Sequence, residues 1–332
     1  MGIKGILAAF LKGFYHSFKG MLVITRLDKE SNERRSRHSP TIRQKHIDGE
    51  DSPNTPRKKE NSKVIIKVMQ CAMLNGGIFL LSVLIFEYVL LPGLDKLFVF
   101  LFGDETFLNK VIWCWIKYIL LLIYKTLWLV PMFIISKIIN AFWFQDIADS
   151  AYRYSRGRPV SFPSISELFA DSIFSIFVQI LFTIQANLIN YILLHPVGYI
   201  LYMVQLTLLH SLYCFEYKWF NMGWKLHERL AFIEAHWAYF IGFGLPLTIL
   251  TQLSDSLVIS GCVFSILFPF FIISGNEASP VMDASDVQLQ FFSLVIAFAN
   301  TFFSNVIGSR QRHQSTSLSS AMVYQTARVQ RR

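Results

Sequence analysis

The chain has 332 residues, of which 53% are hydrophobic and only 16% carry a charge, and its formal net charge is +9. A soluble domain has about 25% charged residues, so too few charges are present to cover the surface of a soluble protein of this length. The composition excludes that class and favours a membrane protein.

Long stretches of the sequence contain no Lys, Arg, Asp or Glu, and several of them reach the about 18–20 apolar residues that cross a bilayer. When these stretches are extended over the few charged residues within or beside them, the apolar segments are 64–91, 111–140, 166–194, 196–215, 237–254, 256–276 and 287–309. We predict an all-α, polytopic helical membrane protein with about six crossings plus a broken or partly penetrating helical hairpin.

Three further segments flank the multi-span membrane domain, which we place at residues 64–309. Residues 1–27 have an amphipathic helical pattern, and we expect this helix to lie in the membrane interface. Packing of the same helix on the protein itself is the alternative. Residues 28–63 are basic and poor in apolar side chains, so we expect a disordered cytosolic tail. Residues 310–332 form a second basic tail, also expected in the cytosol.

The distribution of Lys and Arg predicts the topology. Most basic residues lie in the two tails, in the 141–171 loop and in the 216–236 segment, whereas the acidic segment 277–286 has no Lys or Arg. We therefore expect both termini in the cytosol and the acidic segment in the lumen. An even number of crossings then requires that one apolar segment does not cross. The candidate is 237–254, and the alternative is that the 166–215 hairpin dips into the membrane and returns.

The stretch AFWFQDIADSAYRYSRGRP, residues 141–159, marks the end of the second span. Asp146 and Asp149 share a helix face beside Gln145, and paired carboxylates can bind a metal or move protons. However, Asp149 and Arg153 are spaced as a surface ion pair of a helix. We interpret these four residues as a topology anchor and a candidate partner-docking cluster, without a catalytic role.

A second candidate set would line a pathway for a solute. His210 is an ionisable group within an apolar segment, which makes it a functional candidate. Pro246 and Pro269 are expected to break their helices, and such breaks are tolerated where protein or water covers them. Asn276 and Glu277 end the kinked apolar run.

No sequence motif for catalysis or cofactor binding is present. The sequence lacks a nucleophile elbow, a phosphate-binding P-loop and an HExxH zinc motif. Its four cysteines are far apart, with no CxxC pair. We therefore predict no enzyme activity, no cofactor and no metal. The basic flanks of a membrane protein indicate the lipid bilayer as a partner and argue against nucleic acid.

Four strings of the sequence resemble the etoposide-induced protein 2.4 family, and the resemblance extends over residues 69–303. They are the 141–159 stretch, HSLYCFEYKWFNMGWKLHERL at 210–230, GFGLPLTILT at 242–251 and ISGCVFSILFPFFIISGNEA at 259–278. This family is distantly grouped with CysZ-type sulfate permeases, which mix full spans with partly penetrating helices.

The resemblance implies a multi-pass protein of the endoplasmic reticulum membrane that is required for autophagosome formation or maturation and is not an enzyme. It implies the autophagy machinery and anti-apoptotic membrane proteins as partners, and a link to growth suppression and apoptosis. The family has no established catalytic residues to transfer. A channel or transporter for a small, sulfate-like anion or a lipid is the alternative, and a homo-oligomer is left open.

Overall fold

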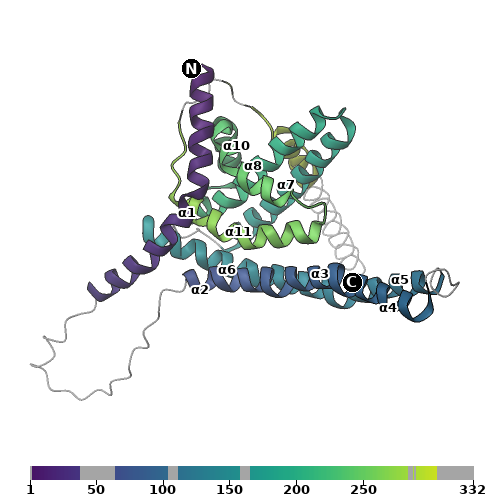
Figure 1. Ribbon diagram of the computed structural model, residues 1–332. Coiled ribbons are helices and arrows are strands. Elements are labelled where there is room, and N and C mark those ends of the chain that lie inside the picture. The colour runs from purple at the N-terminus through teal and green to yellow at the C-terminus, as the bar shows by residue number, and fades with distance from the viewer. Residues whose placement is uncertain are drawn as a thin grey trace, which may run out of the picture.

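The computed structural model describes residues 2–37, 64–103, 111–157, 165–282, 287 and 289–304. Within these ranges every regular element is a helix (Figure 1). Among the described residues, five helices are long and apolar enough to cross a membrane, and six if the bent pair Leu226–Ala235 and Trp237–Thr251 is counted as one span. The predicted all-α, polytopic fold is therefore confirmed.

The described helices of the membrane domain form three antiparallel pairs. The outgoing helix of the first pair consists of α2 (Val64–Ala72), the π-helix η2 (Met73–Leu80), α3 (Leu81–Ile85), the π-helix η3 (Phe86–Leu90) and α4 (Leu91–Phe102). Its return helix consists of α5 (Trp113–Tyr124), the π-helix η5 (Lys125–Leu129) and α6 (Val130–Ser155). The second pair is α7 (Ile165–Ile192) with α8 (Val197–Asn221), and the third is α10 (Trp237–Thr251) with α11 (Leu257–Glu277). The remaining described helices are α1 (Ile3–Arg37), α9 (Leu226–Ala235) and a short apolar helix at Ser293–Ser304.

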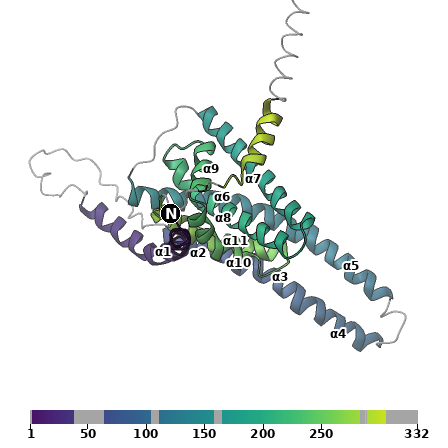
Figure 2. The same cartoon turned by 90° about the horizontal axis from the view of Figure 1, so that it is seen from above.

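Contacts along the first pair define its antiparallel course. Lys67 pairs with Asp146 near one end, and the ring of Phe86 stacks on Tyr124 farther along, with centroids 3.6 Å apart. The two continuous helices have 39 and 43 residues. At 1.5 Å per residue each is about 60 Å long, which is twice the hydrocarbon thickness of about 30 Å. Accordingly, α4 and α5 extend as an arm beyond the other helices (Figure 2).

Buried amides join the two helices of the first pair at mid-length. Asn75, in the wide turns of η2, donates to the Oδ1 of Asn140 at 3.0 Å and to its own helix at the carbonyl of Cys71 at 2.7 Å. Its Oδ1 accepts from the Ser136 hydroxyl at 2.6 Å and from the Asn140 amide at 3.0 Å. In an apolar surrounding these bonds fix the register of the pair.

Replacing Asn75 with leucine removes this network and leaves the amide of Asn140 with fewer partners. We expect Asn75→Leu to lower the free energy of unfolding by about 1–2 kcal/mol. Denaturant titration of the protein in detergent micelles measures the change. Asn187→Leu is the control, because Asn187 is exposed and bonds only within its own helix, to Thr183. Equal losses for both variants would contradict a role of the network in pairing.

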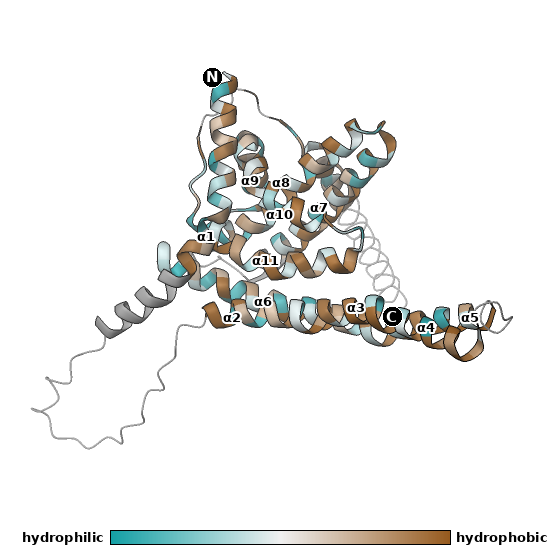
Figure 3. Ribbon diagram, in the orientation of Figure 1, coloured by the Kyte–Doolittle hydropathy of each residue, from teal (hydrophilic) through white to brown (hydrophobic). Residues whose placement is uncertain are grey.

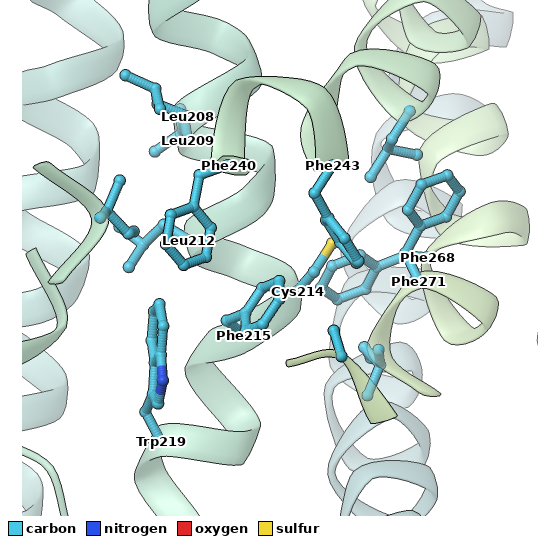
Figure 4. Close-up of a cluster of buried hydrophobic side chains, with 14 of the residues drawn as sticks. Leu208, Leu209, Leu212, Cys214, Phe215, Trp219, Phe240, Phe243, Phe268 and Phe271 are labelled. Atoms are coloured by element: carbon cyan, nitrogen blue, oxygen red, sulfur yellow. The ribbon is translucent and has the colours of Figure 1, made fainter. Parts of the chain in front are cut away.

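The hydrophobic core is built around α8, which packs against α6, α7, α10 and α11. Phe215 of α8 contacts the rings of Phe240 and Phe243 of α10, at centroid distances of 5.1 and 4.8 Å. Figure 4 shows these side chains between α8, α10 and α11, with Trp219 at the end of α8. By contrast, many large apolar side chains of the described helices are exposed, as expected for a surface that lipid covers. Figure 3 shows how apolar residues recur along these helices.

Small residues allow α1 to approach α10 and α11 very closely. A Cβ atom added at Gly13 would collide with the Tyr239 carbonyl, and one added at Gly242 would collide with the Phe10 carbonyl. Farther along α1, the Gly20 N–H donates to Ser274 Oγ of α11 at 2.7 Å. Such contacts between backbones are typical of helix packing in membranes.

The two sides of α1 therefore have different neighbours. The buried side follows a helical stripe of mostly small residues, Ala9, Gly13, His16, Ser17, Gly20 and Ile24. The exposed side carries the large apolar residues of the sequence pattern, among them Leu7, Leu11, Phe14, Phe18 and Met21. The alternative interpretation, packing on the protein itself, thus describes one side, and an interfacial position of the other side stays a prediction. The helix continues to Arg37, past the boundary predicted at residue 27, and residues 38–63 and 305–332 lie outside the described ranges.

His16 is the buried ionisable side chain of this contact. Its Nδ1 lies 2.8 Å from the Tyr239 hydroxyl. Burial, together with the positive charges of Lys12, Lys19 and Lys218, lowers the pKa of His16 from its ordinary value. The imidazole is therefore neutral at neutral pH, and its bond to the tyrosine joins two uncharged groups.

The expected helix breaks at Pro246 and Pro269 do not occur. Both prolines lie inside continuous helices, α10 and α11. The chain bends instead at His236, where α9 and α10 meet at 98°. Gly242 of α10 serves the close approach of α1 described above rather than a break. With 15 residues, α10 is about 23 Å long and is shorter than the hydrocarbon core.

The prediction that the acidic segment 277–286 lies on the side opposite the 141–171 loop is wrong for the part of the segment that the structure describes, residues 277–282. Asn276, at the end of α11, donates to the Ala151 carbonyl at 3.0 Å and to Ser155 Oγ at 2.7 Å, at the end of α6. Lys218 of α8 donates to the Ala278 carbonyl at 2.6 Å. The prediction counted only the charges within the segment itself, whereas a cation of a neighbouring helix, Lys218, bonds to it.

Candidate functional site

Polar side chains gather where α2, α6, α8 and α11 have their ends. Besides the pair of Lys67 and Asp146, the amide of Asn221 at the end of α8 donates to Asp149 Oδ1 of α6 at 3.1 Å. Because every described pair enters and leaves at this end, we call it the polar end. Its hydrogen bonds and ion pairs hold helices that are distant in the sequence in fixed relative positions.

A buried arginine lies at the centre of a cluster at the polar end. The Arg229 side chain is only 1% exposed, and its Nη2 lies 2.8 Å from Asp171 Oδ2. Its Nη1 lies 3.4 Å from Glu216 Oε1, and Nε donates to the Trp224 carbonyl at 2.9 Å. A planar guanidinium with five N–H donors suits such a convergence of acceptors.

Local structure places Arg229 in this cluster. Gly223, with a φ of 78°, ends the turn after α8 in a conformation that favours glycine. Glu228 then accepts from the Lys225 N–H at 2.8 Å and so closes the first turn of α9. Asp171 of α7 accepts from the Leu226 N–H at 3.1 Å, which places its negative charge at the positive start of α9.

Glu216 connects the arginine to α7. Its Oε1 accepts from the Ser175 hydroxyl at 2.5 Å and its Oε2 from Gln179 Nε2 at 2.9 Å. With Arg229, Asp171 and Glu216, the cluster has one cation and two carboxylates, which is a net charge of −1 when all are ionised.

Two cavities adjoin this cluster and share Glu216 and Tyr217 in their walls. The first, of about 240 Å³, also reaches Arg229 and Gln145. The second, of about 360 Å³, extends along α6 and α11 and includes Lys137. The ammonium group of Lys137 lies 5.2 Å from the ring centroid of Phe133 and 5.9 Å from that of Phe264. An ionisable group this far along an apolar helix is a functional candidate.

Residues 60–254 match the model of the family described as "Sulfate transporter CysZ/Etoposide-induced protein 2.4". The chain belongs to this family. Ectopic P granules protein 4 of Caenorhabditis elegans is 30% identical over 279 residues, which are 81% of this chain and 82% of that protein.

Relatives of the etoposide-induced protein 2.4 family also occur outside animals. The Protein EI24 homolog of Dictyostelium discoideum is 33% identical over 64% of this chain and 65% of its own length. The Protein EI24 homolog of Arabidopsis thaliana is 27% identical over 66% of this chain and 76% of its own length. No solved structure matches the chain.

In this member of the family, the residues predicted as an anchor do lie at the polar end, but with other partners than the sequence suggests. Asp149 accepts from Gln145 at 2.9 Å and from Asn221, and Asp146 pairs with Lys67 of α2. The predicted ion pair of Asp149 with Arg153 is not formed among the described residues, and Arg153 is exposed. Partner docking by these residues stays a prediction.

The residues predicted to line a pathway do not line the cavities described above. His210 bonds through Nδ1 to Thr248 Oγ1 at 2.7 Å and joins α8 to α10. Pro246 and Pro269 are buried in helix packing. Asn276 bonds to the end of α6, and Glu277 ends α11 beside it. A role of these residues in transport stays a prediction.

Sequence reasoning missed Arg229, Asp171, Glu216 and Lys137. The charges of the 216–236 segment, which include Glu216 and Arg229, predicted the topology and no site. A signal was present for Lys137, the charge that follows an uncharged run within the second span. No comparable signal marked Arg229, because its partners lie on other helices. Within the described ranges, no group of three or more His, Cys, Asp or Glu side chains is placed to hold a metal ion.

Proposed function

We propose that the protein acts in autophagy at the endoplasmic reticulum membrane, in autophagosome formation or maturation, as a scaffold or tether and not as an enzyme. Family membership carries this proposal, and the C. elegans relative covers most of both chains. The role in autophagy and the location follow from the resemblance of the sequence, and the cytosolic termini follow from the distribution of Lys and Arg. Anti-apoptotic membrane proteins as partners, and a link to growth suppression and apoptosis, belong to the same proposal.

The architecture supports a scaffold in one respect. The polar end presents the ends of all three described helix pairs on one face, and side-chain bonds fix their positions. A fixed face is pre-organised for a partner, and pre-organisation lowers the entropy cost of binding. Asp146 is the predicted docking residue with the most accessible carboxylate, since its side chain is 53% exposed.

Complementation of cells that lack the protein tests the docking surface. We expect Asp146→Ala to reach the endoplasmic reticulum at the normal level but to restore less than about half of the flux through autophagy, because a binding residue outside the core affects partners more than folding. Location is measured by microscopy, and flux by the turnover of lipidated autophagosome markers. Asp95→Ala, which removes an exposed carboxylate from the arm, is the control. Full rescue by Asp146→Ala would rule out docking at this residue, and failure of the wild type to reach this membrane would contradict the proposed location.

A channel or transporter for a small, sulfate-like anion or a lipid is the second candidate. The observation that favours it is the pair of cavities that share Glu216 and Tyr217 and reach Lys137. A charged side chain that faces such a cavity at membrane depth is common in pathways for charged solutes. An anion and a lipid differ in whether acyl chains contribute to binding, and this difference separates the two substrates.

A further inference from the structure

The larger of the two cavities is a groove between α6 and α7. These two helices do not pack closely on one another in the described residues, whereas both pack on α8, and α6 also packs on α11. The walls of the groove are formed by α6, α8 and α11, and Gln179 of α7 completes its edge. Its volume of about 360 Å³ lies within the range of about 300–1,000 Å³ that is usual for small-molecule sites.

One wall of the groove carries a cation without an ionic partner. Lys137 is exposed into the groove, and no carboxylate of the described residues lies within ion-pair distance of its ammonium group. The residue lies nine positions before Asp146 on α6, which is about 14 Å from the polar end along the helix. A charge at this depth is costly unless water or an anion meets it. The aromatic faces of Phe133 and Phe264 compensate only part of that cost.

The wall that α8 forms carries a net negative charge. Glu216 lies in the groove wall, and the cluster that it forms with Arg229 and Asp171 retains one uncompensated negative charge. The groove thus has a positive wall on α6 and a negative wall on α8. A single anion would match only the first wall, whereas a ligand with one negative and one positive group would match both.

Apolar side chains are exposed beside the groove. Ile134 and Ile138 are exposed on α6, and Ile173, Ile176 and Ile180 are exposed on α7, the two helices that flank the groove. Their spacing of three or four residues places each set on one helix face. Acyl chains of a lipid could lie along these side chains while its headgroup enters the groove, whereas a free ion would gain nothing from them.

We propose that this groove binds the headgroup of a zwitterionic glycerophospholipid, with the phosphate at Lys137 and the ammonium group toward Glu216. A free phosphate ion could make the same contact with Lys137. The negative charge at Glu216 and the apolar side chains beside the groove favour the lipid over such an ion. This binding site goes beyond the role in autophagy and does not depend on it.

Equilibrium binding to the purified full-length protein in a maltoside detergent tests the proposal. A fluorescent phosphatidylcholine is the tracer, and the competitors are dihexanoyl-phosphatidylcholine, dihexanoyl-phosphatidylglycerol, glycerophosphocholine and inorganic phosphate. The variants are Lys137→Met, which keeps the length of the side chain, and Lys137→Arg, which keeps the charge. Lys117→Met is the matched control, because Lys117 is an exposed lysine of the arm that does not line the groove.

We expect dihexanoyl-phosphatidylcholine to displace the tracer and Lys137→Met to weaken its binding at least about tenfold, which corresponds to about 1.4 kcal/mol. Lys137→Arg should stay within about threefold of the wild type, and Lys117→Met should bind as the wild type does. Ala141→Trp adds a second variant that fills the groove from its α6 wall and keeps every charge. It should also weaken binding, so the proposal can be tested even if Lys137→Met fails to fold.

Three results would overturn the proposal. Inorganic phosphate that competes as well as the short-chain lipid, with the same dependence on Lys137, would make the groove a site for a free anion. If phosphatidylglycerol binds as tightly as phosphatidylcholine, the negative charge at Glu216 does not contribute to binding. Equal binding by Lys137→Met, Ala141→Trp and Lys117→Met would place the lipid elsewhere. None of these results affects the outcome of the rescue experiment with Asp146→Ala. The lipid site and the role in autophagy can therefore be contradicted separately.

Discussion

Gly13→Ala is expected to lower the free energy of unfolding by at least about 2 kcal/mol, although it adds a single methyl group. The added Cβ would collide with the Tyr239 carbonyl, which is a backbone atom of α10 and cannot rotate away. The two helices must separate or tilt, and the bond between His16 and Tyr239 then lengthens. Chemical unfolding in detergent micelles, monitored by tryptophan fluorescence, measures the loss.

Gly77→Ala is the matched control for this change. Gly77 is helical, and a Cβ atom there meets no other atom within 4 Å. Because alanine has the higher helix propensity, this substitution should be neutral or stabilising by up to about 1 kcal/mol. If Gly13→Ala is as stable as Gly77→Ala, the close approach of α1 and α10 does not exist in solution.

The reciprocal glycine allows a stricter test. Gly242→Ala places its Cβ against the Phe10 carbonyl of α1 in the same helix crossing. Once one alanine has separated the helices, the second should cost less, so the double variant should lose less stability than the sum of the two single variants. Strict additivity would mean that the two glycines act at unrelated contacts.

The role of α1 shows where the sequence is informative and where it is not. Long apolar segments predict the membrane helices, because the thickness of a bilayer sets the length of each run. Contact of α1 with α10 depends on Gly13, and its contact with α11 depends on Ser17 and Gly20. Residues without large side chains leave no trace in a hydropathy pattern. The large residues of α1 produce the visible pattern, and they are the ones that face away from the protein.

The position of the candidate site could be predicted from the sequence, but its hydrogen bonds and ion pairs could not. A shift from apolar to polar residues predicts that the second span ends within residues 141–159, and α6 ends at Ser155. Asp146 and Asp149 have partners on other helices, Lys67 and Asn221, and spacing within one helix cannot reveal them. The same reason explains why Pro246 and Pro269 were expected to break their helices, since the neighbours that pack against both prolines are not visible in the local sequence.

Arg229→Met should cause the largest loss of stability among single substitutions at the polar end, about 3 kcal/mol. Removing one partner of a buried ion pair typically costs about 3–5 kcal/mol, because the remaining charge stays buried without compensation. Here the Asp171 and Glu216 side chains are 17% and 25% exposed, so water screens part of their charge and the lower value applies. The variant also removes the donors to the Trp224 carbonyl. Unfolding titrations in detergent measure the loss.

Two further variants separate the charge from the shape of the arginine side chain. Arg229→Lys keeps the charge, but an ammonium group cannot reproduce the planar fork that meets Asp171, Glu216 and Trp224 together, so it should recover only part of the stability. Glu216→Gln should be less harmful in the Arg229→Met background than alone, because it removes the carboxylate that lost its partner. Arg153→Met is the control, since Arg153 is exposed on the same face and its loss should cost less than about 0.5 kcal/mol. If Arg229→Met costs no more than this control, the cluster does not hold α7, α8 and α9 together.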